Sequence, residues 1–344
     1  METAFNHALG EMPLALFSTL ASLGAGTFIA LTIAFLCGAS HKLVAQKSSA
    51  TQDGADLAKD AKGNSDAKDG KDIKDAATNA ANALALRKTD FFTLIPLLLV
   101  ALGFVAAFFH LATPGNAFNA FNGIGRSPMS NEILAGIIFV AVAVIYWIAV
   151  LTGKIPDIIR KILLALACVA AVAFIVLIGA AYMVSTIPTW DTPLPIIALL
   201  GFGLLGGTLF CLLVLQSADN LQKICSAAFK RDIIGLGVLG AIFALVGVIG
   251  QFVFAGSLVS SDASVLASGA MSAMAAEGIV TATAEMMPWV IAFAIGIVLS
   301  LLLAVVSVIR KPNQLLISLG CLVVLASVLA GRLVFYALYV NVGL

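Results

Sequence analysis

Charged residues are scarce in this chain of 344 residues. Asp, Glu, Lys and Arg make up 11% of the sequence, hydrophobic residues make up 61%, and the mean hydropathy is +1.08. A soluble domain is about 25% charged and 45–50% apolar, so this composition excludes a water-soluble enzyme domain. The net charge of +1 carries no sign of a nucleic-acid-binding surface. We therefore expect a polytopic membrane protein that contacts the lipid bilayer and no nucleic acid.

Residues that bind metals are also few. Only three histidines occur, and two of them, His7 and His41, lie outside opposite ends of the first apolar run. They are poorly placed for a haem held by two histidines. Five cysteines stand singly, with no pair at the spacing of a zinc site or an iron–sulfur cluster: Cys37, Cys168, Cys211, Cys225 and Cys321. We expect no haem and no iron–sulfur cluster in this chain.

Long apolar runs dominate what is present. A membrane-spanning helix needs about 20 mostly apolar residues, and eight runs meet this requirement. They cover residues 12–37, 91–111, 131–152, 160–183, 194–216, 232–255, 287–309 and 313–340. The sequence therefore predicts an all-α fold, a bundle of eight transmembrane helices that forms a single membrane domain over residues 1–344.

Lys and Arg are distributed unevenly between the two sides of this bundle. Of the 19 in the chain, the first, third, fifth and seventh connections hold all but two. Arg126 is alone in the opposite set of connections, and Arg332 lies within the last run. Because cytoplasmic loops carry the excess of Lys and Arg, we expect the N-terminus and the C-terminus both to lie outside the cell membrane.

The first connection, residues 46–88, is charged and of low complexity. Its central part is built from Ala, Lys, Asp, Gly and Asn, with repeated Lys-Asp doublets. Such a composition buries too little apolar surface to offset the entropy of ordering. We expect a charged cytoplasmic loop, either a mobile tether or a docking element for a partner.

Two glycine-rich motifs resemble a dinucleotide fingerprint. Residues 201–206 and 235–240 both match GxGxxG. The fingerprint functions only between a strand and the start of a helix, whereas both motifs here lie inside predicted membrane helices. Close helix packing is the better explanation.

The outer side of the predicted bundle carries two ionisable residues. His110 ends the second run and Glu132 begins the third, so both are expected near the outer surface. Ser130 is placed to cap the third helix, which would put Glu132 in its first turn, where the helix dipole favours a carboxylate. Two readings stay open: a first-turn acid with an interfacial histidine, or a functional pair.

Arg332 lies in the outer half of the last run. Phe335, Tyr336 and Tyr339 follow it at helical spacing, so one face combines a cation with three aromatic rings. On one interpretation, the Arg332 side chain snorkels, so that its charged group reaches the membrane surface. The other is a pocket with an aromatic wall, a fixed donor and a titratable acid, which suits the head group of a quinol.

Four segments resemble the DMSO-reductase membrane-anchor subunit family (DmsC type). They are residues 110–122 (HLATPGNAFNAFN), 130–133 (SNEI), 187–190 (IPTW) and 331–336 (GRLVFY). The eight spans and the outward termini are similar to the family too, over most of the chain beyond residue 90. The charged segment 46–88 departs from the family pattern.

The resemblance implies an anchor subunit in the bacterial plasma (inner) membrane that takes part in anaerobic respiration. Such a subunit oxidises menaquinol to menaquinone and passes the electrons to an iron–sulfur subunit, which relays them to a molybdopterin catalytic subunit. The reductase site would then belong to another chain. The family's quinol-site histidine and glutamate match His110 and Glu132, and we add Arg332, Tyr336 and Asn119 as candidate quinol-binding residues.

Two alternatives compete with this interpretation. A polysulfide-reductase-type quinone subunit would differ in the details of its sequence motifs more than in its physical properties. A secondary transporter is the alternative from a different functional class. It would be expected to have broken helices, charged groups near the membrane midplane and paired repeats, and the sequence has no such acidic pair and no convincing repeat.

Overall fold

The computed structural model describes residues 3–56, 89–111, 114–152, 155–219, 221, 225–260, 273–310 and 313–339. Within these residues the chain is helical and has no strand, and eight helices are long and apolar enough to cross a membrane. The all-α prediction and the eight predicted spans are confirmed. The elements are α1 (Ala4–Gly10), α2 (Met12–Asp56), α4 (Leu94–Phe108), the 3-10 helix η1 (Pro114–Gly123), α5 (Pro128–Thr152), α6 (Asp157–Ala180), α7 (Leu194–Ser217), α9 (Ala227–Ser260), α11 (Ala273–Ile309) and α12 (Gln314–Ala337).

Two helices extend far beyond the apolar runs that predicted them. The backbone of α2 stays helical to Asp56, well past the expected end of the first span, so the first part of the 46–88 segment is helix. The rest of that segment, residues 57–88, lies outside the described residues. Helix α11 begins at Ala273 rather than near 287, because the Ala-rich sequence before the run favours helix.

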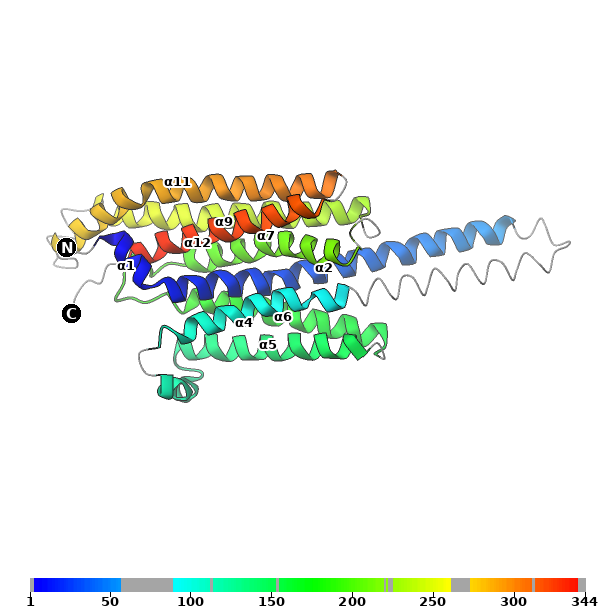
Figure 1. Ribbon diagram of the computed structural model, residues 1–344, viewed down its shortest axis with the longest axis horizontal. Coiled ribbons are helices and arrows are strands. Elements are labelled where there is room, and N and C mark those ends of the chain that lie inside the picture. Colours follow the sequence, from blue (N-terminus) through cyan, green and yellow to red (C-terminus); the bar gives the residue numbers. More distant parts are fainter. Residues whose placement is uncertain are drawn as a thin grey trace.

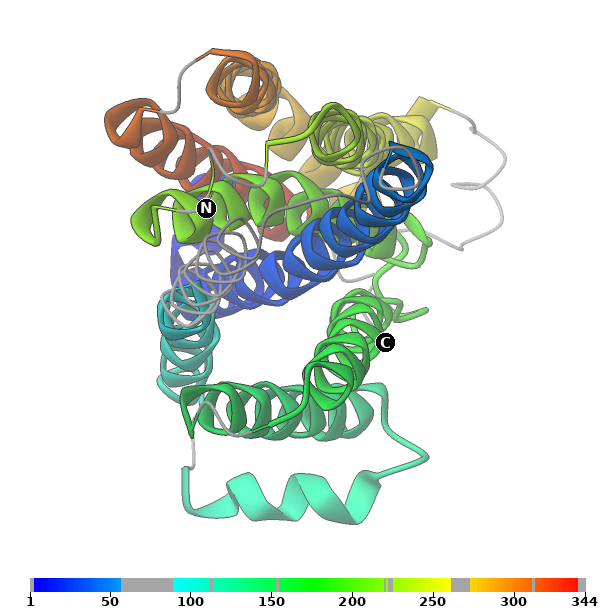
Figure 2. The same ribbon diagram turned by 90° about the vertical axis from the view of Figure 1, so that its right-hand side faces the viewer.

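Helices α2 and α7 form the centre of the bundle. In their spans 83% and 78% of the residues are buried, against 44% or fewer in each of the other six. Helices α9, α11 and α12 lie on one side of this central pair, and α4, α5 and α6 lie on the other (Figures 1 and 2). The peripheral helices expose the apolar side chains that lipid would cover.

The central pair is held together by glycine. A Cβ atom at Gly26 of α2 would overlap the backbone of Gly203 in α7, and one at Gly207 would overlap the backbone of Gly26. Gly203 belongs to the first GxGxxG motif. In the second motif, a Cβ atom at Gly240 of α9 would meet the backbone of Leu205 in α7. Both motifs lie within helices and allow their backbones to approach, as the sequence predicted.

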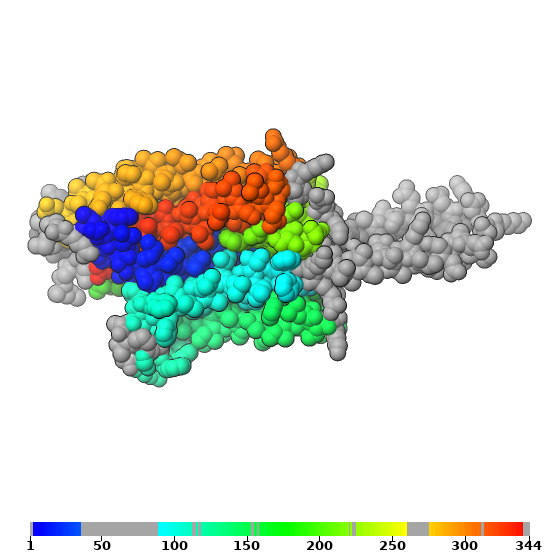
Figure 3. Space-filling model, in the orientation of Figure 1, coloured from blue at the N-terminus to red at the C-terminus, as the bar shows by residue number. Residues whose placement is uncertain are grey.

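The two described ends of the chain lie at the same end of the bundle. Figure 1 shows α1 and the last turn of α12 together, with η1 also at this end, while the far part of α2 projects from the opposite end. Helix α1 packs against α12 and α11 (Figure 3). We call the end that carries α1 and the last turn of α12 the terminal end.

A buried ion pair joins three helices at the opposite end. Asp90, just before α4, accepts a hydrogen bond of 2.6 Å from Nη2 of Arg160 in α6 and one of 3.1 Å from the hydroxyl of Tyr146 in α5. The side chains of Asp90 and Arg160 are only 4% and 12% exposed. Arg160 also lies over the ring of Phe35 in α2, 4.9 Å from its centroid.

Removing one partner of this pair should destabilise the bundle. In Asp90→Ala the buried guanidinium of Arg160 loses the carboxylate that accepts its 2.6 Å hydrogen bond, and breaking a buried ion pair typically costs about 3–5 kcal/mol. We expect a clearly lower midpoint of thermal unfolding in detergent. Asp232→Ala is the matched control, since its partner Arg231 is 78% exposed and such pairs contribute about 1 kcal/mol or less. Equal midpoints for the two variants would contradict this prediction.

Candidate functional site

Arg332 is buried near the terminal end of α12. Its side chain is 1% exposed, although the residue lies only five positions before the last residue of the helix. Its Nε donates a hydrogen bond of 2.7 Å to the Ser18 hydroxyl on α2, and Nη2 donates one of 3.0 Å to the hydroxyl of Tyr336. The side chain points into the bundle and does not snorkel to the surface.

Three aromatic rings surround the guanidinium group. Its central carbon lies 4.3 Å from the ring centroid of Phe335 and 4.9 Å from those of Tyr182 and Tyr336. Cation–π attraction of this kind is worth about 2 kcal/mol when the partners are desolvated. The aromatic wall predicted around Arg332 is present for Phe335 and Tyr336. Tyr339 lies instead against Trp190 and against His7 of α1.

The segment after α6 closes this cluster. The hydroxyls of Tyr182 and Tyr336 are 2.5 Å apart, and desolvation by burial raises the pKa of Tyr182 well above its ordinary value, which keeps the hydroxyl protonated. Trp190 stacks on Phe335 at 4.6 Å and donates from Nε1 to the Phe335 carbonyl. Thr189 donates to the Leu338 carbonyl at 2.6 Å. These bonds fix the aromatic wall to the last turn of α12.

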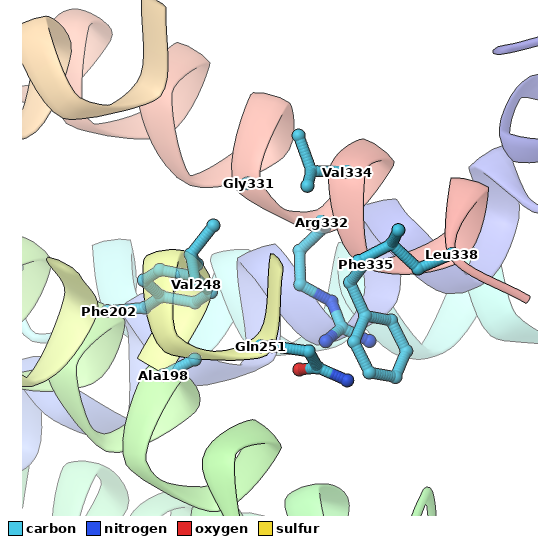
Figure 4. Close-up of a pocket in the computed structure, with 9 residues that line it drawn as sticks. All are labelled: Ala198, Phe202, Val248, Gln251, Gly331, Arg332, Val334, Phe335 and Leu338. Atoms are coloured by element: carbon cyan, nitrogen blue, oxygen red, sulfur yellow. The ribbon is translucent and has the colours of Figure 1, made fainter. Parts of the chain in front are cut away.

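A small pocket also borders Arg332. Its cavity volume is about 10 Å³, room for about one water molecule. Figure 4 shows the side chains of Gln251 from α9 and Phe335 from α12 beside the guanidinium of Arg332. Gln251 is fixed by a hydrogen bond of 3.0 Å from its Nε2 to the Thr189 carbonyl.

Glu132 faces the same cluster from α5. It is 9% exposed, and its carboxyl group interacts electrostatically with Arg332 and with the hydroxyls of Tyr182 and Tyr336. The predicted cap at Ser130 is wrong. Helix α5 begins at Pro128, because proline is preorganised for the first helical position, and Ser130 therefore lies inside the first turn and Glu132 beyond it. Glu132 is therefore not a first-turn acid.

His110 and Asn119 lie outside the buried cluster around Arg332. His110 follows α4 with its side chain 37% exposed, and its Nδ1 is 3.6 Å from Oε2 of Glu11. Asn119 is an exposed residue of η1, which lies against α5 on the outside of the bundle (Figure 2). The structure thus brings together Arg332, Tyr336 and Glu132, and pairs His110 with an acid that sequence reasoning did not select.

Sequence reasoning also missed Tyr182 and Ser18. Tyr182 lies at the end of the fourth predicted span, and the alternation of spans places it at the depth of Arg332, so topology could have indicated it. Ser18 is one of several small hydroxyl residues in the first span, including Thr19 and Ser22, and nothing in the sequence distinguishes it. Among the described residues, no three of His, Cys, Asp and Glu are grouped so as to hold a metal ion.

Comparison with known proteins decides the family. The model of the DMSO reductase anchor subunit (DmsC) family matches residues 79–338. The chain belongs to this family. The resemblance seen in the sequence is confirmed, and the chain is a multi-pass membrane protein of a family of anchor subunits. Its place is therefore in a complex with other subunits of a DMSO reductase.

Individual relatives of this anchor subunit support the same family. It is 31% identical over 248 residues to YnfH, an anaerobic dimethyl sulfoxide reductase subunit of Escherichia coli, covering 72% of this chain and 81% of that protein. It is 30% identical to the C subunit of the anaerobic dimethyl sulfoxide reductase of the same organism, covering 72% and 80%. The C subunit of the Haemophilus influenzae anaerobic dimethyl sulfoxide reductase is 37% identical over 98 residues, 28% of this chain and 35% of that protein. No solved structure matches the chain.

Proposed function

We propose that this anchor subunit oxidises menaquinol at the terminal end of the bundle and passes the electrons to an iron–sulfur subunit. That subunit relays them to a molybdopterin catalytic subunit, where the terminal acceptor is reduced. The chain is then no enzyme by itself. Its family supports the role of an anchor in a DMSO reductase complex, and the observation that carries the proposal is the buried cluster of Arg332, Tyr182 and Tyr336 facing Glu132.

The cluster contains the groups that oxidation of a quinol needs. Two hydroxyls of the head group must be hydrogen-bonded, and both protons must leave as the electrons leave. Arg332 is a permanent cation and donor, the two tyrosine hydroxyls are neutral donors and acceptors, and Glu132 is a carboxyl group able to accept a proton. In this proposal Glu132 takes one proton, His110 serves the other hydroxyl, and Arg332 and Tyr336 hold the ring.

Binding the head group requires movement. The pocket beside Arg332 has room for about one water molecule, whereas sites for small molecules are typically about 300 Å³ or more. The side chains of Gln251 and Phe335 line this pocket, so their displacement would open a path to Arg332. The iron–sulfur subunit would dock at the terminal end, within electron-transfer reach of the ring.

The proposal is tested with the assembled complex in membranes. We expect a menaquinol analogue to support reduction of the terminal acceptor, and an artificial electron donor that delivers electrons directly to the partner subunits to support it independently. If the artificial donor is active and the menaquinol analogue is inert in the wild-type complex, the quinol-oxidising role is wrong. Substrate transport without quinol turnover would favour the transporter reading.

The orientation in the bacterial inner membrane is a further prediction. The excess of Lys and Arg in alternate connections supports an orientation with the terminal end outside. Glu277 and Arg310 are exposed residues at the two ends of α11. In a background without other reactive cysteines, Glu277→Cys should react with a membrane-impermeant thiol reagent in intact spheroplasts, and Arg310→Cys only after lysis. The reverse pattern would place the terminal end in the cytoplasm.

A further inference from the structure

Glu11 lies beside His110 at the terminal end of the bundle. It joins α1 to α2, and its Oε2 is 3.6 Å from Nδ1 of His110. The two side chains are 28% and 37% exposed, so the pair lies between the buried helices and the outside. The distance is that of an ion pair and exceeds a direct hydrogen bond. Contacts of this kind often shorten only when substrate is bound.

Helix α2 connects this pair with the buried cluster. The Glu11 carbonyl accepts the backbone hydrogen bond of Ala15, so Glu11 leads directly into the helix. Ser18, which accepts the hydrogen bond from Arg332, follows Glu11 by seven residues. Seven residues are two helical turns, or about 10 Å, and bring both side chains to the same face of α2. Glu11 and His110 therefore lie about two turns outward of Arg332.

Two other acids described at this end are placed differently. Oε2 of Glu285 accepts a hydrogen bond of 2.9 Å from the backbone nitrogen of Ala4, and Glu277 is exposed on α11. His7 of α1 stacks on Tyr339, with ring centroids 5.0 Å apart. Glu11 is thus the carboxylate that the structure places against the ring of His110.

We propose that Glu11 is a positioning residue that holds His110 as the base for one of the two quinol protons. This inference rests on the proposed oxidation of menaquinol. A carboxylate at Nδ1 favours the tautomer with the proton on Nδ1, which leaves the lone pair of Nε2 free to accept a proton.

The quinol gives two electrons, one at a time, to the iron–sulfur subunit and leaves as the quinone. One hydroxyl proton passes to the Glu132 carboxylate and the other to Nε2 of His110. The partly exposed pair of His110 and Glu11 then releases its proton to water at the terminal end, and Glu132 releases the other proton to the same side, which restores both groups to their starting states.

Glu11→Gln keeps the size of the side chain and removes its charge. In the assembled complex we expect at least a tenfold lower kcat with a menaquinol analogue and a KM within about twofold of wild type. Glu11→Asp, which keeps the carboxylate, should recover part of the loss. The matched control is Glu277→Gln, an exposed acid at the same end, which should turn over like wild type. All three variants should keep wild-type activity with the artificial donor.

A double variant separates positioning from a structural role. If Glu11 acts through His110, then Glu11→Gln in the His110→Ala background causes no further loss, whereas a purely structural effect would multiply with that of His110→Ala. Wild-type kcat in Glu11→Gln, or a full additional tenfold loss in the double variant, would overturn the inference.

The contact itself can be tested without any quinol. Glu11→Cys and His110→Cys together should form a cross-link with a short bifunctional thiol reagent, detected by mass spectrometry, while Glu277→Cys with His110→Cys should not. Absence of the Glu11–His110 cross-link would overturn the inference even if menaquinol is oxidised. If the wild-type complex does not oxidise the menaquinol analogue, the proposed function fails, and the assigned role of Glu11 fails with it even when the cross-link forms.

Discussion

Glu132→Gln should abolish turnover with a menaquinol analogue while the complex still assembles. The substitution keeps the shape of the side chain and some of its hydrogen bonding, and removes the group that accepts a proton. Glu132 is 9% exposed and faces Arg332, so few other groups can replace it. We expect a loss of at least a hundredfold in kcat, the usual scale for removing a general base.

The artificial electron donor provides the control for this variant. Because it bypasses the quinol, its activity should equal that of wild type in Glu132→Gln. Glu277→Gln is the matched exposed acid at the same end and should retain turnover with both donors. Wild-type menaquinol turnover in both Glu132→Gln and His110→Ala would refute the assignment of the site and leave Glu132 as a structural acid.

Arg332→Lys should also lose most menaquinol turnover, although the charge is retained. Lysine cannot reproduce the planar fork that bonds Ser18 and Tyr336 at the same time. We expect at least a tenfold lower kcat with a lower midpoint of thermal unfolding. Each lost hydrogen bond to a buried charged group costs about 1.5–3 kcal/mol. Turnover and the unfolding midpoint are measured on the same preparation.

Arg126→Lys is the control for the conservative change. Arg126 is an exposed arginine near the start of α5, with one hydrogen bond of 2.9 Å to the Asn122 carbonyl. It should keep turnover within about twofold of wild type. If Arg332→Lys matches this control, the fork geometry of Arg332 has no role in quinol oxidation, and its charge alone is sufficient.

The sequence predicted the architecture well because lipid imposes strong rules on it. A spanning helix must be long and apolar, and each of the eight runs consists mostly of apolar residues. The tight approach of α2 and α7 was also foreseeable, since Gly203 and Gly207 form a small-residue face. Arg332 was foreseeable as a buried group, because a cation within a span is costly and requires partners.

The pairing of side chains across helices could not be predicted in the same way. The rotation of α2 about its axis decides that Ser18, and not Thr19, meets Arg332, and apolar runs do not specify that rotation. Glu11 was inconspicuous because it precedes the first span, in a segment that has no periodicity of its own. The start of α5 at Pro128 shifted Glu132 out of the first turn, a difference of three residues that changes its chemical interpretation.

The placement of Arg332 near the terminal end has a bioenergetic consequence. A quinol oxidised there, as proposed, would release its protons on the side where the iron–sulfur subunit is proposed to dock, and its electrons would travel no farther than that subunit. If the catalytic subunit also draws the protons for its reduction from this side, no net charge crosses the bilayer during turnover. Oxidation of menaquinol by this complex would then be electroneutral, and any membrane potential would have to arise where the quinone is reduced.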